Sequence, residues 1–401
     1  QYWGIFEAKV GGVLYYLIDN QYYFKRHGLY GHYDDAERFA FLSRAALEML
    51  PYIDFKPDVI HCNDWETALV PVYFRLFYAN NDWYAGIKTL LTIHNIQYQG
   101  KYGIELLRDV LGIPESETQL LEYDNCVNIL KGGIECANWV STVSPTYAEE
   151  ILNPWFSHGL DSILNARSWK LSGILNGIHT TLYNPETDED IYANYTAEDL
   201  SGKAINKKKL QERLNLTEDP SVPIISMVSR MVSHKGLDLV KEALDQLMWE
   251  SDVQFVILGS GEWEYESFFR DMQGRYPGRL SACFGFVPEL AHKIYAGSDI
   301  FLMPSKSEPC GLSQMIALRY GTIPVVRETG GLKDSIQDSG DGEGNGFTFQ
   351  TYNSGDMLQA IRRALEGYAK PEGWSVLVDR AMKCDNSWGR SANEYIRLYK
   401  S

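Results

Sequence analysis

The chain alternates short apolar, β-branched runs with longer helical stretches, and this alternation constrains its fold more than any other feature. The runs expected to form strands are Val59–Cys62, Leu90–His94, Trp139–Val143, Ile224–Ser229, Gln254–Leu258, Ile300–Met303 and Thr322–Val326. Helices are expected between them, for example over Ala36–Leu50, Leu237–Met248 and Cys310–Tyr320. Strands that alternate with helices form parallel sheets joined by crossover helices, so the predicted class is α/β.

Length, charge and cysteine usage narrow the class of protein. The 401 residues, 45% of them hydrophobic, are enough for two or three domains with sizeable cores. A formal net charge of -16 argues against nucleic acid or an anionic membrane as a partner, because both require clustered positive charge. No apolar run approaches the roughly 18 residues of a membrane span, no signal peptide is visible, and the 6 scattered cysteines are typical of reduced thiols. We therefore expect a cytoplasmic protein.

The organisation of the chain changes between about residues 171 and 223. Residues 180 to 200 are polar, a charged helix with three consecutive lysines follows, and a new apolar strand then begins. We interpret this stretch as the passage from one α/β domain, residues 1–175, to a second, residues 176–385. Ligands of such sheets bind at the carboxyl ends of strands, so two facing domains would hold one in the cleft between them.

The loop after the first strand of the second domain, in SRMVSHKGLDL, carries two cations. Arg230 and Lys235, at the carboxyl end of a strand and next to a helix N-terminus, suit a diphosphate. A solvated loop with two surface cations explains this short segment equally well.

A second loop, in PSKSEPCGLSQ, combines a carboxylate with a helix start. Glu308 and Pro309 form a turn, and Gly311 to Ser313 open a helix whose backbone N–H groups suit a phosphate. A carboxylate near a leaving diphosphate suits a sugar hydroxyl or positive charge on the anomeric carbon of a transition state. The alternative is a charge that only favours the helix dipole. We favour the functional interpretation because several such features occur together.

Three further polar residues stand at strand ends or at the domain junction, namely Asp64, His94 and Asn176. Each also has an ordinary structural explanation. A lone histidine is more often a capping or core residue, Asp64 is equally suited to a helix N-cap, and Asn176 beside a glycine is typical of a turn.

The stretch KVGGV near the start looks like a phosphate cradle, because Lys9 precedes Gly11 and Gly12. Apolar residues, however, occupy every second position before the glycines, and the β-branched and aromatic run VLYYLI follows them. A strand, two glycines and a second strand make a two-residue hairpin, and no helix is expected before Asp34. We therefore predict a hairpin and leave these residues out of the candidate site.

Together the segments closely resemble the family of bacterial glycogen synthases and plant starch synthases. The matching stretches, in the family's order, are AERFAFLSRAALE, PDVIHCNDWETALVP, TIHNIQYQGKY, STVSPTYAEEI, GILNGI, SRMVSHKGLDL, FLMPSKSEPCGLSQMIALRYGTIPVVRETGGLKDS and SWGRSANEYIRLY. One such motif would be weak, but the ordered set, which runs from about Ala36 to the end, is highly specific.

The resemblance implies two Rossmann-like domains that face a central cleft in the GT-B arrangement, with a terminal helix, residues 386–401, crossing back to the first domain. It implies transfer of glucose, with retention, from a nucleotide sugar, usually ADP-glucose, to the non-reducing 4-hydroxyl of an α-1,4-glucan such as glycogen or a malto-oligosaccharide. It also implies that no cofactor or metal is required, and a cytoplasmic location, or the plastid in a plant.

The resemblance also assigns residues. Arg230 and Lys235 fall on the diphosphate-binding pair, and Glu308 falls on the active-site glutamate. His94 and Asn176 fall on residues that contact the glucosyl unit. The remaining matches are an acidic cleft position, an aromatic residue that stacks on adenine, and two phosphate-binding turns: Asp64, Phe286, Cys310, Gly311, Leu312, Ser313, Thr329, Gly330 and Gly331.

The chain departs from the family in a few places. Phe286 stands where Tyr is common, and Lys306 and Ser307 replace the usual Arg-Phe before Glu308. The family's first strand and its Lys-x-Gly-Gly-Leu donor loop are not seen, so we expect an incomplete first domain and poor turnover. The alternatives are a protein that binds an ADP-sugar or a glucan without catalysis, and a related GT-B transferase that uses UDP-glucose, such as a sucrose synthase. The forms HNIQYQG and EPCGL favour the synthase.

Overall fold

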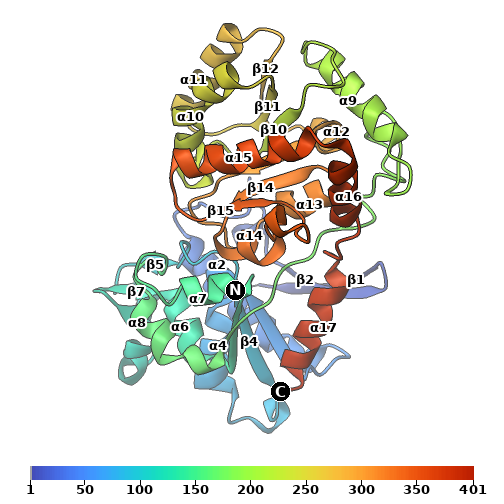
Figure 1. Cartoon of the computed structure of the whole chain (residues 1–401). Coiled ribbons are helices and arrows are strands. Elements are labelled where there is room, and N and C mark those ends of the chain that lie inside the picture. Colours follow the sequence, from blue (N-terminus) through green and yellow to red (C-terminus); the bar gives the residue numbers. More distant parts are fainter. Residues whose placement is uncertain (1) are drawn as a thin grey trace. The chain divides into compact units, whose positions relative to one another are not determined.

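The computed structural model describes residues 2–401, which form two compact units (Figure 1). The first unit extends to Val143 and also contains Ala148–Gly173, and the second contains Ser144–Tyr147 and Ile174–Ser401. Each unit is an α/β body with its own parallel sheet. The crossing of the last helix to the first domain stays a prediction. No helix within residues 2–401 is both long enough and apolar enough to traverse a bilayer.

The first unit is built on a parallel sheet in the order β3-β4-β8-β9. Its strands are β3 (Val59–Asn63), β4 (Lys88–Ile93), β8 (Trp139–Thr142) and β9 (Leu171–Gly173). A small antiparallel sheet consists of β5 (Lys101–Tyr102), β6 (Glu122–Tyr123) and β7 (Cys126–Asn128). The helices are α2 (Asp35–Glu48), α3 (Asp64–Thr67), α4 (Leu69–Tyr73), α5 (Leu106–Asp109), α6 (Ile129–Cys136) and α8 (Asp161–Ala166), and α7 (Pro145–Glu150) belongs partly to each unit.

The N-terminal segment is the predicted hairpin. Strands β1 (Gly4–Val10) and β2 (Val13–Asp19) pair antiparallel around a two-residue turn. Gly11 and Gly12 have φ angles of 56° and 84°, the left-handed combination that tight hairpins require and that glycine adopts without strain. The hairpin prediction is therefore confirmed, and Lys9 lies on a strand.

One expectation about this region was wrong. A one-turn helix, α1 (Gln21–Phe24), forms before Asp34, where no helix was expected. The side chain of Asn20 caps it by accepting from the N–H of Tyr23 over 2.9 Å. The helix does not follow the glycines directly, so it gives them no phosphate cradle.

The second unit contains a six-stranded parallel sheet in the order β12-β11-β10-β13-β14-β15. Its strands are β10 (Ile224–Val228), β11 (Gln254–Gly259), β12 (Leu280–Phe284), β13 (Ile300–Met303), β14 (Ile323–Arg327) and β15 (Phe347–Phe349). Its helices are α9 (Ser201–Arg213), α10 (Leu237–Glu250), α11 (Trp263–Arg275), α12 (Pro288–Gly297), α13 (Ser313–Arg319), α14 (Gly330–Ser335), α15 (Ser354–Tyr368), α16 (Pro371–Met382) and α17 (Trp388–Tyr399).

The central strands of this sheet are mostly apolar because helices cover both faces. Every residue of β11 and β13 is buried. Helices α10 and α15 pack on each other, and α15 lies across the sheet in Figure 1. Helix α12 packs on α9 and α13, and α9 and α12 share a hydrophobic cluster with β10 and β11 that includes Leu210, Ile294 and Val256.

The predicted strands all occur, with small shifts at their ends. The helix expected over Cys310–Tyr320 begins later, at Ser313. Gly311 has a φ of 70°, which is incompatible with a right-handed helix, so the preceding residues form a turn instead.

Candidate active site

The second unit brings the predicted cations and carboxylate to one edge of its sheet. Strands β10, β13 and β14 are parallel neighbours. The loops after their carboxyl ends carry Arg230 and Lys235, then Glu308, then the Thr-Gly-Gly turn. Strand order reverses between β10 and β13, and open α/β sheets bind ligands at this kind of switch point. We therefore take these loops as the candidate active site of this unit.

Lys235 and Glu308 form an ion pair in this site. Nζ of Lys235 lies 2.6 Å from Oε2 of Glu308, and the hydroxyl of Ser305 donates to the same oxygen over 3.0 Å. The lysine and glutamate side chains are only 16% and 8% exposed. The sequence placed these two residues near one ligand, and the structure places them in direct contact. The lysine is thus held by a carboxylate that a bound anion would compete with.

Arg230 adds exposed positive charge in the same loop. His234, next to Lys235 in the chain, reports the effect of these cations. Burial, and then the charges of Lys235 and Arg230, lower the pKa of His234. The loop therefore presents a positive field of the kind that attracts a diphosphate.

The Thr-Gly-Gly turn packs directly on the backbone of the Glu308 loop. The N–H of Gly331 donates to the carbonyl oxygen of Glu308 over 3.1 Å. A Cβ on Gly330 would lie 2.0 Å from that oxygen, and one on Gly331 would lie 2.0 Å from the carbonyl oxygen of Cys310. Only glycine fits at either position, and the N–H of Gly331 is already engaged by the protein. Thr329, just before the turn, is fully buried.

A third glycine joins the Lys235 loop to the Glu308 loop. Gly236 has a φ of 77°, and a Cβ there would lie 2.0 Å from the carbonyl oxygen of Pro304. The N–H of Lys306 also donates to the carbonyl of His234 over 2.9 Å. The two loops therefore hold each other through main-chain contacts.

The segment from Cys310 to Ser313 leads into α13. Gln314 fixes it, because its side-chain amide donates to the carbonyls of Gly311 over 2.9 Å and Cys310 over 3.2 Å. Burial raises the pKa of the Cys310 thiol to about 12, so this side chain stays neutral. Leu312 is 45% exposed. Any contact with a phosphate in this segment would come from its backbone or from the Ser313 hydroxyl.

Asn176 lies beside the same loop. A backbone hydrogen bond from Asn176 reaches Cys310. Its side-chain Oδ1 is buried and has no hydrogen-bond partner in the part of the chain that the structure describes. A Cβ on Gly177 would lie 2.3 Å from the backbone nitrogen of Trp388, so this segment is packed against another one and is not a free turn. A buried amide oxygen without a partner is uncommon and suits a ligand hydroxyl.

Phe286 follows β12 at the carboxyl edge of the sheet. Its ring is 93% exposed. Other large rings of the chain, such as Trp249 at 86%, are almost as exposed, so exposure alone does not mark Phe286; what its position adds is a ring at the carboxyl edge that is available to stack on a planar group.

The first unit places Asp64 and His94 together. They follow the neighbouring parallel strands β3 and β4, and Oδ1 of Asp64 accepts from the N–H of His94 over 2.7 Å. Nε2 of His94 lies 2.9 Å from Oδ1 of Asn63. Burial raises the pKa of Asp64. Its side chain makes no bond that caps α3, so the ordinary N-cap explanation does not describe it.

Asp64 also adopts an uncommon backbone conformation, with a φ of 57°. This left-handed region is costly for a residue with a side chain, by roughly 1 kcal/mol or more. The bond to His94 keeps the carboxylate aimed across the strand ends. Strain of this type is frequent at functional sites.

A cavity that the sequence reasoning did not assign lies next to these residues. It has a volume of about 420 Å³ and is lined by aromatic and polar groups: Trp65, Gln97, Tyr98, Gln99, Gly100, Lys101, Tyr102 and His158. Gly100 allows the Trp65 ring to pack against the backbone of this wall, because a Cβ there would lie 2.3 Å from the ring. The signal was present in the sequence, since aromatic and polar residues alternate directly after the strand that ends before His94. Aromatic faces flanked by hydrogen-bonding groups suit a sugar ring.

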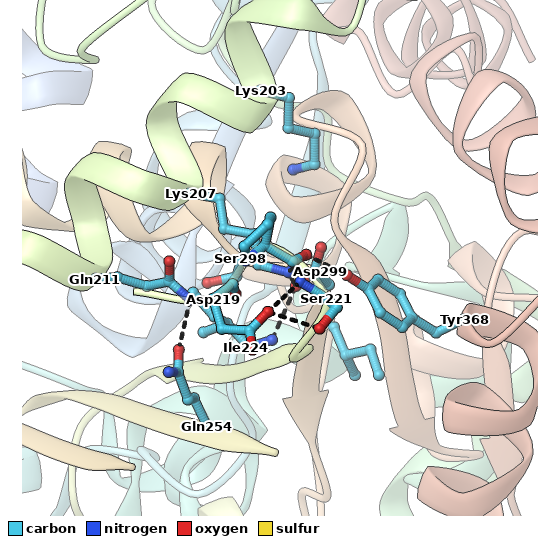
Figure 2. Close-up of polar contacts among 12 residues, drawn as sticks. Lys203, Lys207, Gln211, Asp219, Ser221, Ile224, Gln254, Ser298, Asp299 and Tyr368 are labelled. Atoms are coloured by element: carbon cyan, nitrogen blue, oxygen red, sulfur yellow. Dashed lines mark hydrogen bonds and ion pairs between the residues drawn. The ribbon is translucent and has the colours of Figure 1, made fainter. Parts of the chain in front are cut away.

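A larger cavity, of about 1050 Å³, lies at the opposite edge of the second unit's sheet and is lined largely by α9, α15 and α16. Several of its polar groups bond to neighbouring side chains or to the backbone (Figure 2). Nζ of Lys207 lies 2.8 Å from Oδ2 of Asp299, which also accepts from the N–H of Ile224 over 2.8 Å. The amide of Gln211 donates to Gln254 over 2.9 Å. These groups are satisfied within the protein, so cavity size does not mark the reactive edge.

Asp188, Asp190 and His292 are a group whose side-chain types and spacing suit a metal ion. Nδ1 of His292 lies 2.7 Å from Oδ2 of Asp188, and the hydroxyl of Tyr320 donates to the same carboxylate. Burial opposes the charge of Asp188, but the bonds from His292 and Tyr320 hold its pKa below the usual value. The group thus works as a hydrogen-bonded network that ties the irregular segment before α9 to α12 and to the end of α13.

Comparison with known proteins matches both units. The family described as starch synthase catalytic domain matches residues 1–166, and glycosyl transferases group 1 matches residues 207–375. A glycogen synthase of Bacillus cereus (strain ATCC 10987 / NRS 248) is 51% identical over 405 residues, covering 100% of this chain and 85% of that protein. A glycogen synthase of Geobacillus stearothermophilus is 50% identical over 404 residues, covering 100% and 83%.

Solved structures give the same result. The catalytic domain of starch synthase IV from Arabidopsis thaliana, bound to ADP and acarbose, matches with a TM-score of 0.90 at 38% identity, over 99% of this chain and 84% of that one. Sucrose-phosphate synthase from Thermosynechococcus elongatus matches with a TM-score of 0.59 at 19% identity, over 92% and 80%, which shows a likeness of fold alone. The predicted class of fold, two Rossmann-like α/β domains of the GT-B type, is confirmed.

Proposed function

The chain belongs to the glycogen and starch synthase family, and we propose that it transfers glucose from ADP-glucose to the non-reducing 4-hydroxyl of an α-1,4-glucan, with retention of the anomeric configuration. It is a hexosyltransferase. The observation that carries the proposal is the contact of Lys235 with Glu308 at the carboxyl edge of the second sheet, beside Arg230.

The opposite charges at this edge suit the two charges that develop during transfer. As the bond from the anomeric carbon to the diphosphate breaks, negative charge grows on the leaving group and positive charge on the carbon. Arg230 and Lys235 stabilise the first, and Glu308 stabilises the second. Phe286 stacks on adenine, and Asn176 offers its unpartnered oxygen to a sugar hydroxyl.

The first unit serves the sugars in this proposal. The imidazole of His94 and the carboxylate of Asp64 lie at adjacent strand ends, where they bind hydroxyls of the transferred glucosyl unit and of the acceptor. The aromatic and polar cavity around Tyr98 takes the glucan chain. Its exposed tyrosine ring, 51% accessible, provides an apolar face for a pyranose.

We propose that no cofactor or metal takes part, because two cations of the chain supply the positive charge that the diphosphate needs. A chelator should therefore leave transfer unchanged, and inhibition that added magnesium reverses would contradict this. ADP-glucose and the glucan are the proposed partners, without nucleic acid or membrane. Unpaired cysteines agree with a reducing compartment such as the cytoplasm.

The test is transfer of labelled glucose to glycogen and to malto-oligosaccharides, with ADP-glucose and UDP-glucose compared at equal concentration. Transfer that prefers ADP-glucose supports the proposal. Preference for UDP-glucose favours a related transferase, and binding of ADP without transfer favours a non-catalytic binding protein. A chain extended upstream of residue 1 tests the expected impairment: higher turnover supports that expectation, and equal turnover contradicts it.

A further inference from the structure

The two carboxylate oxygens of Glu308 have different surroundings. Oε2 accepts from Nζ of Lys235 over 2.6 Å and from the hydroxyl of Ser305 over 3.0 Å. No hydrogen bond within residues 2–401 is made to Oε1, and Oε1 is not sealed from solvent. One oxygen is therefore anchored, and the other is left for a ligand.

The two donors on Oε2 are not equivalent. In the proposed function Lys235 also binds the diphosphate of the donor, so part of its attraction to Glu308 is lost when the donor arrives. Ser305 is neutral, fully buried, and has no such second partner to move to. Its hydroxyl is the contact that persists.

The backbone holds Ser305 in place on both sides. The carbonyl of the preceding Pro304 is pressed against Gly236, and the N–H of the following Lys306 donates to His234 over 2.9 Å. The guanidinium of Arg327 donates to the carbonyl of Lys306 over 2.8 Å. A serine held in this way can keep its hydroxyl, and therefore the carboxylate oxygen that accepts from it, in one position.

We propose that Ser305 is a positioning residue for the glucosyl transfer, which orients Glu308 by holding Oε2 so that Oε1 meets the anomeric carbon. The inference rests on the proposed function. It assigns the electrostatic role to Glu308 and Lys235, and the alignment of the carboxylate to Ser305.

The experiment compares the wild-type chain with Ser305→Ala and Ser305→Cys, and with Ser375→Ala, an exposed serine of α16, as the control. A hydrogen bond to a charged group is strong enough that its loss should lower kcat about 10- to 100-fold in Ser305→Ala. The KM for ADP-glucose and the affinity for ADP should stay within about twofold. Ser305→Cys keeps the shape but offers only a weak donor, so its kcat should fall between the two. Ser375→Ala should match the wild type.

The outcomes separate the inference from the function on which it rests. A wild-type chain that binds ADP but transfers no glucose overturns both. An active wild type with unchanged kcat in Ser305→Ala overturns the inference alone. A cysteine variant as active as the wild type shows that Ser305 only fills space, which also overturns it, and this variant decides the matter if the alanine variant fails to fold.

Discussion

The two edges of the six-stranded sheet use polar residues in opposite ways. At the amino edge, Lys207 and Asp299 are paired and buried, and each makes further bonds to the protein. At the carboxyl edge, Arg230 and the ring of Phe286 are exposed, and Glu308 has one oxygen without a partner within residues 2–401. The same strands connect both edges.

This difference shows how a site can be recognised without a ligand. Satisfied polar groups stabilise a fold, whereas groups left partly unsatisfied at a strand end are available to a substrate. The amino edge has the larger cavity, yet Lys207, Asp299 and Gln211 there are bonded within the protein and are not free to bind a substrate. If the comparison is right, substitutions at the amino edge should change mainly stability, and substitutions at the carboxyl edge should change mainly glucosyl transfer.

The largest effect is expected from Asp299→Ala at the amino edge. It leaves Lys207 as a buried charge without its partner and the N–H of Ile224 without an acceptor, so the free energy of unfolding should fall by about 3–5 kcal/mol. Urea unfolding measures this. The folded variant should keep the kcat of the wild type.

Asp252→Ala is the matched control, because this exposed carboxylate lines the same cavity. Its effect on unfolding should stay within about 0.5 kcal/mol. A lower kcat in folded Asp299→Ala would contradict the view that the amino edge contributes to stability and not to transfer.

The next effect is expected at the carboxyl edge, from Glu308→Gln. Removing the charge that faces the anomeric carbon should lower kcat by about 10²–10³-fold. Stability should fall by about 1–3 kcal/mol, less than in Asp299→Ala, because the glutamine side chain can still accept from Ser305 while the largely buried Lys235 loses its charge partner. Steady-state kinetics and thermal unfolding on the same preparation check both. A strongly destabilised variant would mean that the pair is mainly structural.

A smaller effect is expected from Phe286→Ala. Stacking of an aromatic ring on a base contributes about 1–3 kcal/mol, so the KM for ADP-glucose should rise about tenfold while kcat stays within twofold. Phe286→Tyr, which keeps the ring, is the control and should match the wild type. An unchanged KM in the alanine variant would remove Phe286 from the donor site.

The last effect is a pH dependence of stability at the amino edge, which accumulates gradually over several pH units. Burial lowers the pKa of Lys203 to about 7; Asp299 opposes this shift and Lys207 adds to it. Because the unfolded chain binds a proton that the folded chain releases above pH 7, stability should rise with pH from about 7 to 10, by at most about 1.4 kcal/mol per pH unit.

Unfolding in urea at several pH values in this range measures the slope. Lys203→Met should flatten it, and Lys241→Met, which removes an exposed ion pair on α10, should not. A wild-type stability that does not change over this range would contradict the assignment.

Much of the fold could be predicted because long apolar runs fix buried strands. Val59, Ile224 and Ile300 each begin a strand where the pattern placed them. The pattern missed α1 and the sheet of β5, β6 and β7, since elements of two to four residues are too short to show a period. The start of α13 moved because Gly311 takes a left-handed conformation that depends on tertiary packing.

The candidate site was predictable only in part. Strand-end positions brought Asp64 to His94 and the Lys235 loop to the Glu308 loop, because parallel neighbours end at one edge. The contact between Lys235 and Glu308 joins residues 73 positions apart, and it depends on rotamers that no motif encodes. The proposed role of Ser305 depends on its bond to the same glutamate oxygen, so it could not be predicted from the sequence either.

The three glycines at positions 236, 330 and 331 join the loops of the carboxyl edge main chain to main chain. The shape of that edge is therefore set by backbone contacts, so neighbouring side chains can differ between relatives without changing it. Lys306 and Ser307, where the chain departs from the family's usual Arg-Phe, lie in this permissive stretch. In a random library, positions 306 and 307 should tolerate many residues while the glycines tolerate none, so the family can drift in specificity without rebuilding its reactive centre.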